Sequence, residues 1–439
     1  MKKKNKPENL WTAEDERSHP SSALEWWAVI GFFTSKEDQK HWSIKAVLSE
    51  GGVDPAHVDA LSNIALFDED TNQHYIYINK KLGSHLEIQP NTFEVHLDES
   101  SMKGTYPTYD VHLRDPKNDI TLDLKIHAES HPYWVAQEAT NGWLPMGLGF
   151  FRYGFIPKTS VSGTMKIQGK TFTVEGTGYF EHVWGSFSFI NPFAHWRNLS
   201  KTISIYARLV LWWLQNQQPR IPESLMWATE NNPLGYDWAW SVLDNGWMIF
   251  YGNILCWLME GPAPGVLILS KDGKTFAEYS VLRFRYLHTE SASEFDFVYP
   301  TDFEITAVHE KETIHLRFTM TSECRQYVSR FAGGKYWLAF VTCEAPGKVV
   351  GYYKNDSENV LLSGKCKIEP QRQASVIGHN TLRIDLLKPP KGVGVSIELD
   401  SHYLRKKITA KLRFFPKPLL RFSMKRMPPT VKKPLRKEV

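Results

Sequence analysis

Cysteine is scarce in this chain: its 439 residues contain four, scattered singly between positions 256 and 366. They form neither the close pairs of a zinc site nor the dense set of a disulfide-stabilised domain. The 16 histidines show no His-x-x-x-His pair on a predicted helix and no cluster with cysteine. We therefore expect a reducing compartment, no metal site and no metal cofactor.

Long apolar runs are absent as well. No stretch approaches the roughly 18 apolar residues that a membrane-spanning helix requires. Residues 1–20, MKKKNKPENLWTAEDERSHP, are basic at the start but lack the apolar middle region of a secretory signal. The chain also lacks a glycine-rich phosphate loop and a Gly-x-Ser-x-Gly nucleophile motif. We expect a cytoplasmic protein, with the inner face of the membrane as its site of any peripheral association.

Acidic residues are nearly missing from the end of the chain. Residues 401–439 contain 13 lysines and arginines and one acid, Glu438, and the cations alternate with Phe, Leu and Pro. This pattern is typical of segments that contact an anionic lipid surface, where each basic residue contributes about 1 kcal/mol. A solvated tail is an equally weighted alternative, while nucleic acid is disfavoured because no nucleic-acid-binding motif accompanies the charge. An anionic membrane surface is thus one expected partner.

Most of the chain shows the period-2 pattern of β-strands. In TYDVHLRDPKNDITLDLKIHAE, alternating apolar residues flank a Pro-Lys-Asn-Asp turn, which predicts an antiparallel hairpin. Similar runs fill residues 42–129 and 247–412, and closed barrels would remove the free edges of so many strands. One stretch, HWRNLSKTISIYARLVLWWLQNQQP, has helical spacing and ends at a proline. We expect this helix to pack on a barrel or to lie in a lipid interface.

Two short internal sequence similarities, called echoes below, indicate that the arrangement of strands is duplicated. LEWWAVI from Leu24 is similar to YDWAWSV from Tyr236, and SGTMKI from Ser162 is similar to SGKCKI from Ser363. The two offsets nearly agree, which favours two β-barrels in tandem. The predicted divisions are an N-terminal tail 1–19, a first barrel 20–195, a helical linker 196–235, a second barrel 236–412 and a basic tail 413–439.

The stretch VEGTGYFEHVWGSFS, residues 174–188, places an acid among aromatic rings. In a strand its side chains alternate between two faces: Tyr179, Glu181 and Val183 on one, and Phe180, His182 and Trp184 on the other. An inward carboxyl in an aromatic space loses hydration, which favours its neutral, proton-bearing form. Tyr179 could hydrogen-bond Glu181, and the rings could stabilise a cation. The pattern suits protonation of a C=C bond; a solvent-facing, inert glutamate is the alternative.

At this point the sequence resembles a known family. GTGYFEHVWG resembles the Gly-x-Gly-Tyr-His-Asp-His-Asn-Trp-Gly signature of the hydroxyneurosporene synthase (carotenoid 1,2-hydratase) group within the AttH-like, tandem lipocalin-like superfamily. ALEWWAVIGFFT and YDWAWSVLDNGWMIFYG resemble the opening strands of the two halves of that superfamily. The resemblance implies an all-β fold of two lipocalin-like (calycin-type) antiparallel β-barrels in tandem with one inserted helix. It also implies an apolar cavity and no metal or organic cofactor.

The resemblance carries roles to individual residues. Glu181 stands at the family's catalytic aspartate, and Tyr179 and His182 match residues that would assist it. This chain departs from the signature at two positions, where Phe180 replaces a histidine and Val183 replaces an asparagine. Fewer polar side chains therefore remain to bind and orient water. The expected substrate-binding residues are Trp184, Phe180, Trp26, Trp27, Tyr153, Phe151, Trp238 and Trp240, with Phe151 and Tyr153 in place of a His-x-Trp pair of the hydratases.

Two functions from different classes follow. The first is a cofactor-free hydratase, or a related isomerase or cyclase, that acts on an isoprenoid or carotenoid-like alkene with Glu181 as the acid. The second is a lipid-binding or lipid-transfer protein without chemistry, in which Glu181 and His182 are structural. Substitution of Glu181 separates the two functions, because only the first loses its activity.

Overall fold

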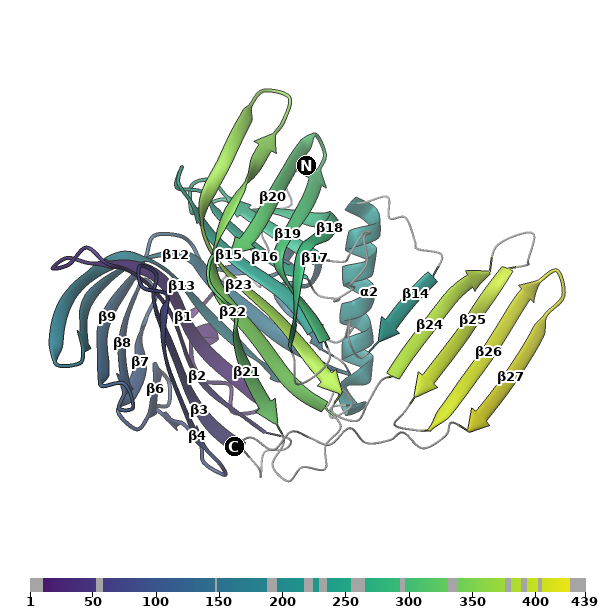
Figure 1. Ribbon diagram of the computed structural model, residues 1–439, viewed down its shortest axis with the longest axis horizontal. Helices are drawn as coiled ribbons and strands as arrows, with labels where there is room; N and C mark the ends of the chain where they lie inside the picture. The colour runs from purple at the N-terminus through teal and green to yellow at the C-terminus, as the bar shows by residue number, and fades with distance from the viewer. Residues whose placement is uncertain are drawn as a thin grey trace.

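The computed structural model describes most of the chain: residues 11–52, 58–146, 148–187, 196–216, 224–228, 235–253, 265–292, 297–330, 338–375, 380–387, 393–401 and 405–426. These residues form three antiparallel sheets and one long helix. Two sheets are strongly curled and lie against each other, and the third stands apart beyond the helix (Figure 1).

The first barrel is a curled sheet in which β1 lies between β2 and β13. Its strands run in the order β4-β3-β2-β1-β13-β12-β9-β8-β7-β6-β5, and β10 and β11 also pair with β12. The strands are β1 (Leu24–Ser35), β2 (His41–Gly52), β3 (Val58–Asp68), β4 (Gln73–Lys81), β5 (Glu87–Ile88), β6 (Phe93–Leu97), β7 (Ser100–Thr105), β8 (Thr108–Asp115), β9 (Ile120–Ala128), β10 (Tyr133–Trp134), β11 (Trp143–Met146), β12 (Gly149–Ile167) and β13 (Lys170–Ser186). The expected hairpin around Pro116 is β8–β9.

The second barrel repeats this plan in the order β20-β19-β18-β17-β16-β15-β23-β22-β21, and a further pairing of β20 with β22 joins its ends. Its strands are β15 (Gly235–Leu243), β16 (Met248–Asn253), β17 (Gly265–Ser270), β18 (Ala277–Ala292), β19 (Phe297–His309), β20 (Glu312–Met320), β21 (Arg325–Arg330), β22 (Leu338–Lys354) and β23 (Asn359–Ser375). The predicted class of two lipocalin-like barrels in tandem with an inserted helix is confirmed.

The two sequence echoes differ in their structural meaning. LEWWAVI lies in β1 and YDWAWSV in β15, which have equivalent places in the two barrels. Both strands carry a buried acid: Glu25 contacts His182 and Asp237 contacts Arg372, each at 2.8 Å. SGTMKI lies in β12, which β13 separates from β1, whereas SGKCKI lies in β23, which pairs directly with β15. Only the first echo therefore marks equivalent positions.

A third sheet combines one strand that precedes the second barrel in sequence with four strands that follow it. It consists of β14 (Ser224–Ala228), β24 (Asn380–Leu387), β25 (Val393–Ser401), β26 (Lys406–Phe415) and β27 (Leu419–Arg426). The sequence predicted a barrel up to residue 412 and a tail from 413, but that boundary falls inside β26. The period-2 pattern is the same in a barrel strand and in this separate sheet, so it does not distinguish them.

The predicted helix is α2 (Leu199–Asn216), preceded by a short 3-10 turn at Trp196–Asn198. Ile205 and Leu209 are buried between the barrels, and the hydroxyl of Thr202 donates to the carbonyl of Leu148 at 2.8 Å. These contacts anchor one face of α2 on the first barrel. In the described part of the chain no helix combines the length and the apolarity needed to cross a membrane.

Three apolar cores explain why β1 reads WWAVIGFF. Trp27, Val29 and Phe33 point into the first barrel, while Ile30 and Phe32 join a core that includes residues of both barrels. The second barrel has an interior core of its own. Because β1 is covered on both faces, its apolar residues are nearly continuous instead of alternating. The two barrels are thus curled sheets packed back to back, with an apolar layer between them.

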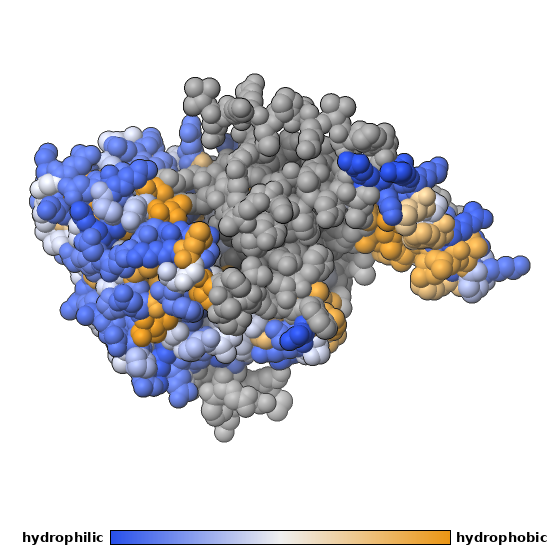
Figure 2. All heavy atoms as spheres, turned by 90° about the horizontal axis from the view of Figure 1, so that it is seen from below, coloured by the Kyte–Doolittle hydropathy of each residue, from blue (hydrophilic) through white to orange (hydrophobic). Residues whose placement is uncertain are grey.

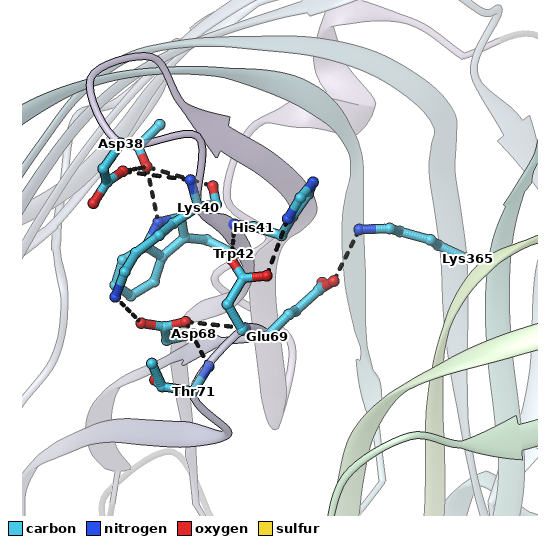
Figure 3. Close-up of polar contacts among 10 residues, drawn as sticks. Asp38, Lys40, His41, Trp42, Asp68, Glu69, Thr71 and Lys365 are labelled. Carbon is cyan, nitrogen blue, oxygen red and sulfur yellow. Dashed lines mark hydrogen bonds and ion pairs between the residues drawn. The ribbon is translucent and has the colours of Figure 1, made fainter.

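Polar contacts also join the barrels. The indole nitrogen of Trp240 donates to the carbonyl of Pro157 at 2.8 Å within the shared core. The ammonium of Lys365 in β23 contacts Glu69 of the first barrel at 2.8 Å (Figure 3). Glu69 directly follows Asp68, the last residue of β3, which contacts Lys40 at 2.7 Å. The site described next lies in the layer that these contacts hold closed.

Candidate active site between the barrels

β13 carries the predicted acid in the middle of the molecule. It pairs with β1 on one side and β12 on the other, and Gly178 allows close packing because a Cβ there would meet Val161 and Thr159 within 3 Å. Glu181 and Tyr179 point toward the second barrel, and the Glu181 side chain is 6% exposed. The side chains of β13 alternate as expected. The face that carries Glu181 lies in the layer between the barrels and not inside the first barrel.

Three side chains donate hydrogen bonds to Glu181. The indole nitrogen of Trp26 in β1 donates to Oε1 at 2.8 Å. The hydroxyl of Tyr179 donates to Oε2 at 2.9 Å, and the hydroxyl of Tyr153 in β12 donates to the same oxygen. The two tyrosine hydroxyls also lie 2.9 Å apart. Neighbours in all three central strands thus fix the position of the carboxyl group.

The tyrosines stay protonated in this position. Burial, and after it the charge of Glu181, raises the pKa of both Tyr153 and Tyr179 well above 10. Neither hydroxyl can therefore act as a base near neutral pH, and both remain hydrogen-bond donors.

A cavity of about 80 Å³ opens beside Glu181, with walls from both barrels. Its lining is mainly apolar and aromatic: Trp26, Ile30, Val135, Leu144, Pro145, Met146, Phe151, Tyr153, Trp238, Phe250, Gly252 and Val266, with Lys45, Glu181, Tyr236 and Glu369 as polar members. Walls that are mostly apolar lower the local dielectric constant and strengthen the electrostatic interactions inside the cavity.

The second polar group on the cavity wall is centred on Glu369 of β23. Its Oε1 accepts a hydrogen bond from the hydroxyl of Tyr236 at 2.7 Å, and its other oxygen forms an ion pair with Lys45 of β2. Glu344 lies 3.6 Å from the ammonium of Lys45 and also pairs with Lys367 at 3.1 Å. The cavity therefore offers a charged, paired group in addition to Glu181.

His182 lies on the other face of β13, away from the cavity. Its Nε2 is 2.8 Å from Glu25 and its Nδ1 is 2.7 Å from the carbonyl oxygen of Asp15. Burial lowers the pKa of His182, although Glu25 partly opposes this shift. His19, Glu25 and His182 each place one ligand atom within 4.8 Å of the others, so among the described residues this group could hold a metal ion. In this structure these atoms hydrogen-bond to one another.

The structure brings together about half of the residues that the sequence singled out. Trp26, Phe151, Tyr153, Tyr179, Glu181 and Trp238 lie at or beside the cavity. Others pack elsewhere: Trp27 and Phe180 in the core of the first barrel, Trp184 against His19, and Trp240 in the shared core. Strand alternation separates Trp27, Phe180 and Trp184 from the cavity, whereas Trp240 shares the face of Trp238 but is not part of the cavity lining.

Sequence reasoning missed Lys45, Tyr236 and Glu369. Lys45 is a charged residue in the otherwise apolar run IKAVL, and Glu369 directly follows Ile368. A charge in a strand that is covered on both faces must find a partner, and that was the available signal. Their partnership could not be read from the sequence because it joins β2 of one barrel to β23 of the other.

Comparisons with known proteins agree with this architecture. The crystal structure of a predicted AttH protein from Nitrosomonas europaea is similar with a TM-score of 0.55 and 17% identity, over 82% of this chain and 96% of that one. Kievitone hydratase from Nectria haematococca gives 0.52 and 13%, over 82% and 92%. None of the curated proteins compared in sequence matches. A family model described as AttH-like matches residues 3–229, which is more than half of the chain. The chain belongs to the AttH-like family.

Proposed function

We propose that this protein is a hydratase, or a related isomerase or cyclase, that protonates a C=C bond of an apolar substrate bound between the barrels. Glu181 is the proton donor and needs no organic cofactor for this step. The observation that carries the proposal is the hydrogen-bonded ring around Glu181 beside an aromatic cavity.

The hydrogen-bonded ring holds the proposed donor Glu181 in one position beside the cavity. Its Oε2 and the hydroxyl oxygens of Tyr153 and Tyr179 each lie within hydrogen-bonding distance of the other two. Both hydroxyls donate to Oε2, which fixes the orientation of the carboxyl group at the cavity wall. Trp26 donates to the other carboxyl oxygen, Oε1.

The cavity walls suit the charge that the reaction creates. Transfer of the Glu181 proton to one alkene carbon leaves a carbocation at the other, and the rings of Trp26, Trp238 and Phe250 line the cavity in which aromatic quadrupoles would stabilise it. In hydration, water bonds to the cationic carbon and its surplus proton returns to Glu181. In isomerisation, a neighbouring C–H bond supplies that proton and a new C=C bond forms.

The group around Glu369 favours hydration over isomerisation. Lys45, Tyr236 and Glu369 are polar members of an otherwise apolar lining, and they offer both donors and acceptors to a bound water. The histidine that Phe180 replaces would point into the first barrel, because Phe180 packs in that core. Its loss therefore leaves the cavity wall unchanged.

The substrate class follows from size and lining. A cavity of about 80 Å³ holds on the order of half a dozen waters, so it accommodates the reacting end of a long molecule and not its whole length. The resemblance of GTGYFEHVWG to the hydroxyneurosporene synthase group supports an acyclic isoprenoid or carotenoid-like end. The fold shared with kievitone hydratase supports hydration.

The competing function, lipid binding without chemistry, predicts a different response to one substitution. Purified protein is incubated with lycopene and with squalene, two acyclic isoprenoids, in water enriched in heavy oxygen, and the products are analysed by mass spectrometry. Hydration adds one labelled water to the substrate. Glu181→Gln should abolish product while ligand binding, measured by quenching of tryptophan fluorescence, persists.

Glu175→Gln is the matched control, because Glu175 lies on the same strand but is 60% exposed and pairs with Lys36. This variant should retain full turnover. Binding of either isoprenoid without any product, with Glu181→Gln indistinguishable from the original protein, would establish the lipid-binding function instead.

A further inference from the structure

The third sheet has one apolar face. The register pairs Ile397 with Ala410 and Ala410 with Phe422, so these side chains share a face across three strands. The same alternation places further apolar residues on that face: Ile384, Leu386, Val395, Leu399, Ile408, Leu412, Leu420 and Met424. Polar residues such as Lys411 and Arg421, which pair directly, lie on the opposite face.

The apolar face is exposed where it is most distant from the barrels. In β27 Leu420 is 70% exposed and Phe422 is 62% exposed, and Leu412 in β26 is exposed beside them. Figure 2 shows these strands as a projection with orange residues gathered on one side and blue residues on the other. Large contiguous apolar patches of this kind mark a binding surface.

The charge of the hairpin formed by β26 and β27 indicates what kind of partner binds the apolar face. Residues 405–426 contain nine lysines and arginines and no acid. Lys406 and Arg426 lie opposite each other in the register of β26 and β27. By alternation, both are on the apolar face, at its end. A surface that is apolar with cations at its edge complements an anionic phospholipid layer, in which acyl chains lie beneath negative headgroups. A second copy of this chain would bring nine like charges to the same contact.

We propose that the apolar face of the third sheet docks on an anionic membrane. Leu420, Phe422 and Leu412 enter the headgroup and acyl boundary, and Lys406 and Arg426 contact the phosphates. The cations of the opposite face lie one sheet thickness further away, at a distance comparable with the screening length of about 8 Å at physiological salt. They therefore contribute less. This inference is independent of the chemistry proposed for Glu181.

The experiment is cosedimentation of the full chain with vesicles of phosphatidylcholine alone and of phosphatidylcholine with one quarter phosphatidylglycerol. The chain should bind the anionic vesicles and release them at high salt. Lys406→Gln with Arg426→Gln should weaken the partition coefficient about thirtyfold, because each basic residue contributes about fivefold. Leu420→Ser with Phe422→Ser should weaken it at least tenfold.

Two controls match these variants. Lys411→Gln with Arg421→Gln removes the same charge from the opposite face and should cost no more than about fivefold. Leu361→Ser removes an apolar side chain that is 85% exposed on β23 and should leave binding unchanged. Circular dichroism of each variant verifies that the fold persists.

Three results would overturn the proposal. One is no binding of the original chain to anionic vesicles. Another is equal binding by the Leu420→Ser, Phe422→Ser variant, because the apolar face would then take no part. The third is a dimer in sedimentation equilibrium that this variant dissociates, which would make the face a contact between copies of the chain.

Discussion

Replacement of Glu25 by glutamine should destabilise the first barrel and change its acid sensitivity. The Glu25 carboxylate is buried behind the site, where it accepts hydrogen bonds from the hydroxyl of Ser18 at 3.1 Å and the backbone N–H of His19 at 2.9 Å. The rings of His19 and His182 contact it as well. Because His182 and Glu181 are adjacent on β13, this cluster also supports the site.

The magnitude follows from the pKa of Glu25. Burial raises this pKa, but the hydrogen bonds from His182 and His19 outweigh burial and lower it from 4.5 to about 2. A shift of that size is worth about 3 kcal/mol of folding free energy. Since the folded pKa is depressed, the stabilisation is complete above pH 4.5 and is lost as the pH falls toward 2.

Urea unfolding followed by tryptophan fluorescence measures the effect. At pH 7, Glu25→Gln should lower the free energy of unfolding of the first barrel by about 3 kcal/mol. Near pH 3 the difference between variant and original protein should shrink to about half. The exposed control Glu175→Gln should leave the midpoint of the urea unfolding transition unchanged at both pH values. Equal stability of Glu25→Gln and the original protein at pH 7 would refute the reasoning.

Two further predictions concern the site and the contact between the barrels. Tyr153→Phe removes one donor to Glu181 and should lower kcat of the proposed reaction about tenfold to hundredfold in a steady-state assay. Glu278 of β18 in the second barrel accepts hydrogen bonds from the backbone N–H groups of Gln137 and Glu138, at 2.6 and 3.1 Å. Burial, followed by the charge of Glu138, raises the pKa of Glu278 from 4.5 to about 8. Stability should therefore decrease between these values as the pH rises, and urea titrations of Glu278→Gln should show a weaker pH dependence.

The sequence predicted the fold because its signal is local. The alternation of apolar residues in 108–128 predicts a hairpin without knowledge of its neighbours in the fold. The helical spacing predicts α2 in the same way. The echo of Leu24 in Tyr236 also marked equivalent strands. The third sheet was not separated from the second barrel, because strand pairing between distant segments decides membership of a sheet and alternation does not.

The site was predicted in part. Alternation correctly groups Glu181 with Tyr179 and sets His182 on the other face, but it does not say which face meets the cavity. β13 is covered on both faces, so neither polarity nor burial distinguishes them. The donors from Trp26 and Tyr153, and the group around Glu369, depend on contacts between strands that are distant in sequence.

The central claim is that Glu181 donates a proton to the substrate, and infrared difference spectroscopy tests directly whether the carboxyl group bears one. The spectrum of the original protein minus that of Glu181→Gln should contain the carbonyl stretch of a protonated carboxylic acid, which moves in deuterium oxide. Glu278→Gln serves as the reference, because that buried acid should give a separate band. A difference spectrum that shows only the paired bands of a carboxylate would contradict the account.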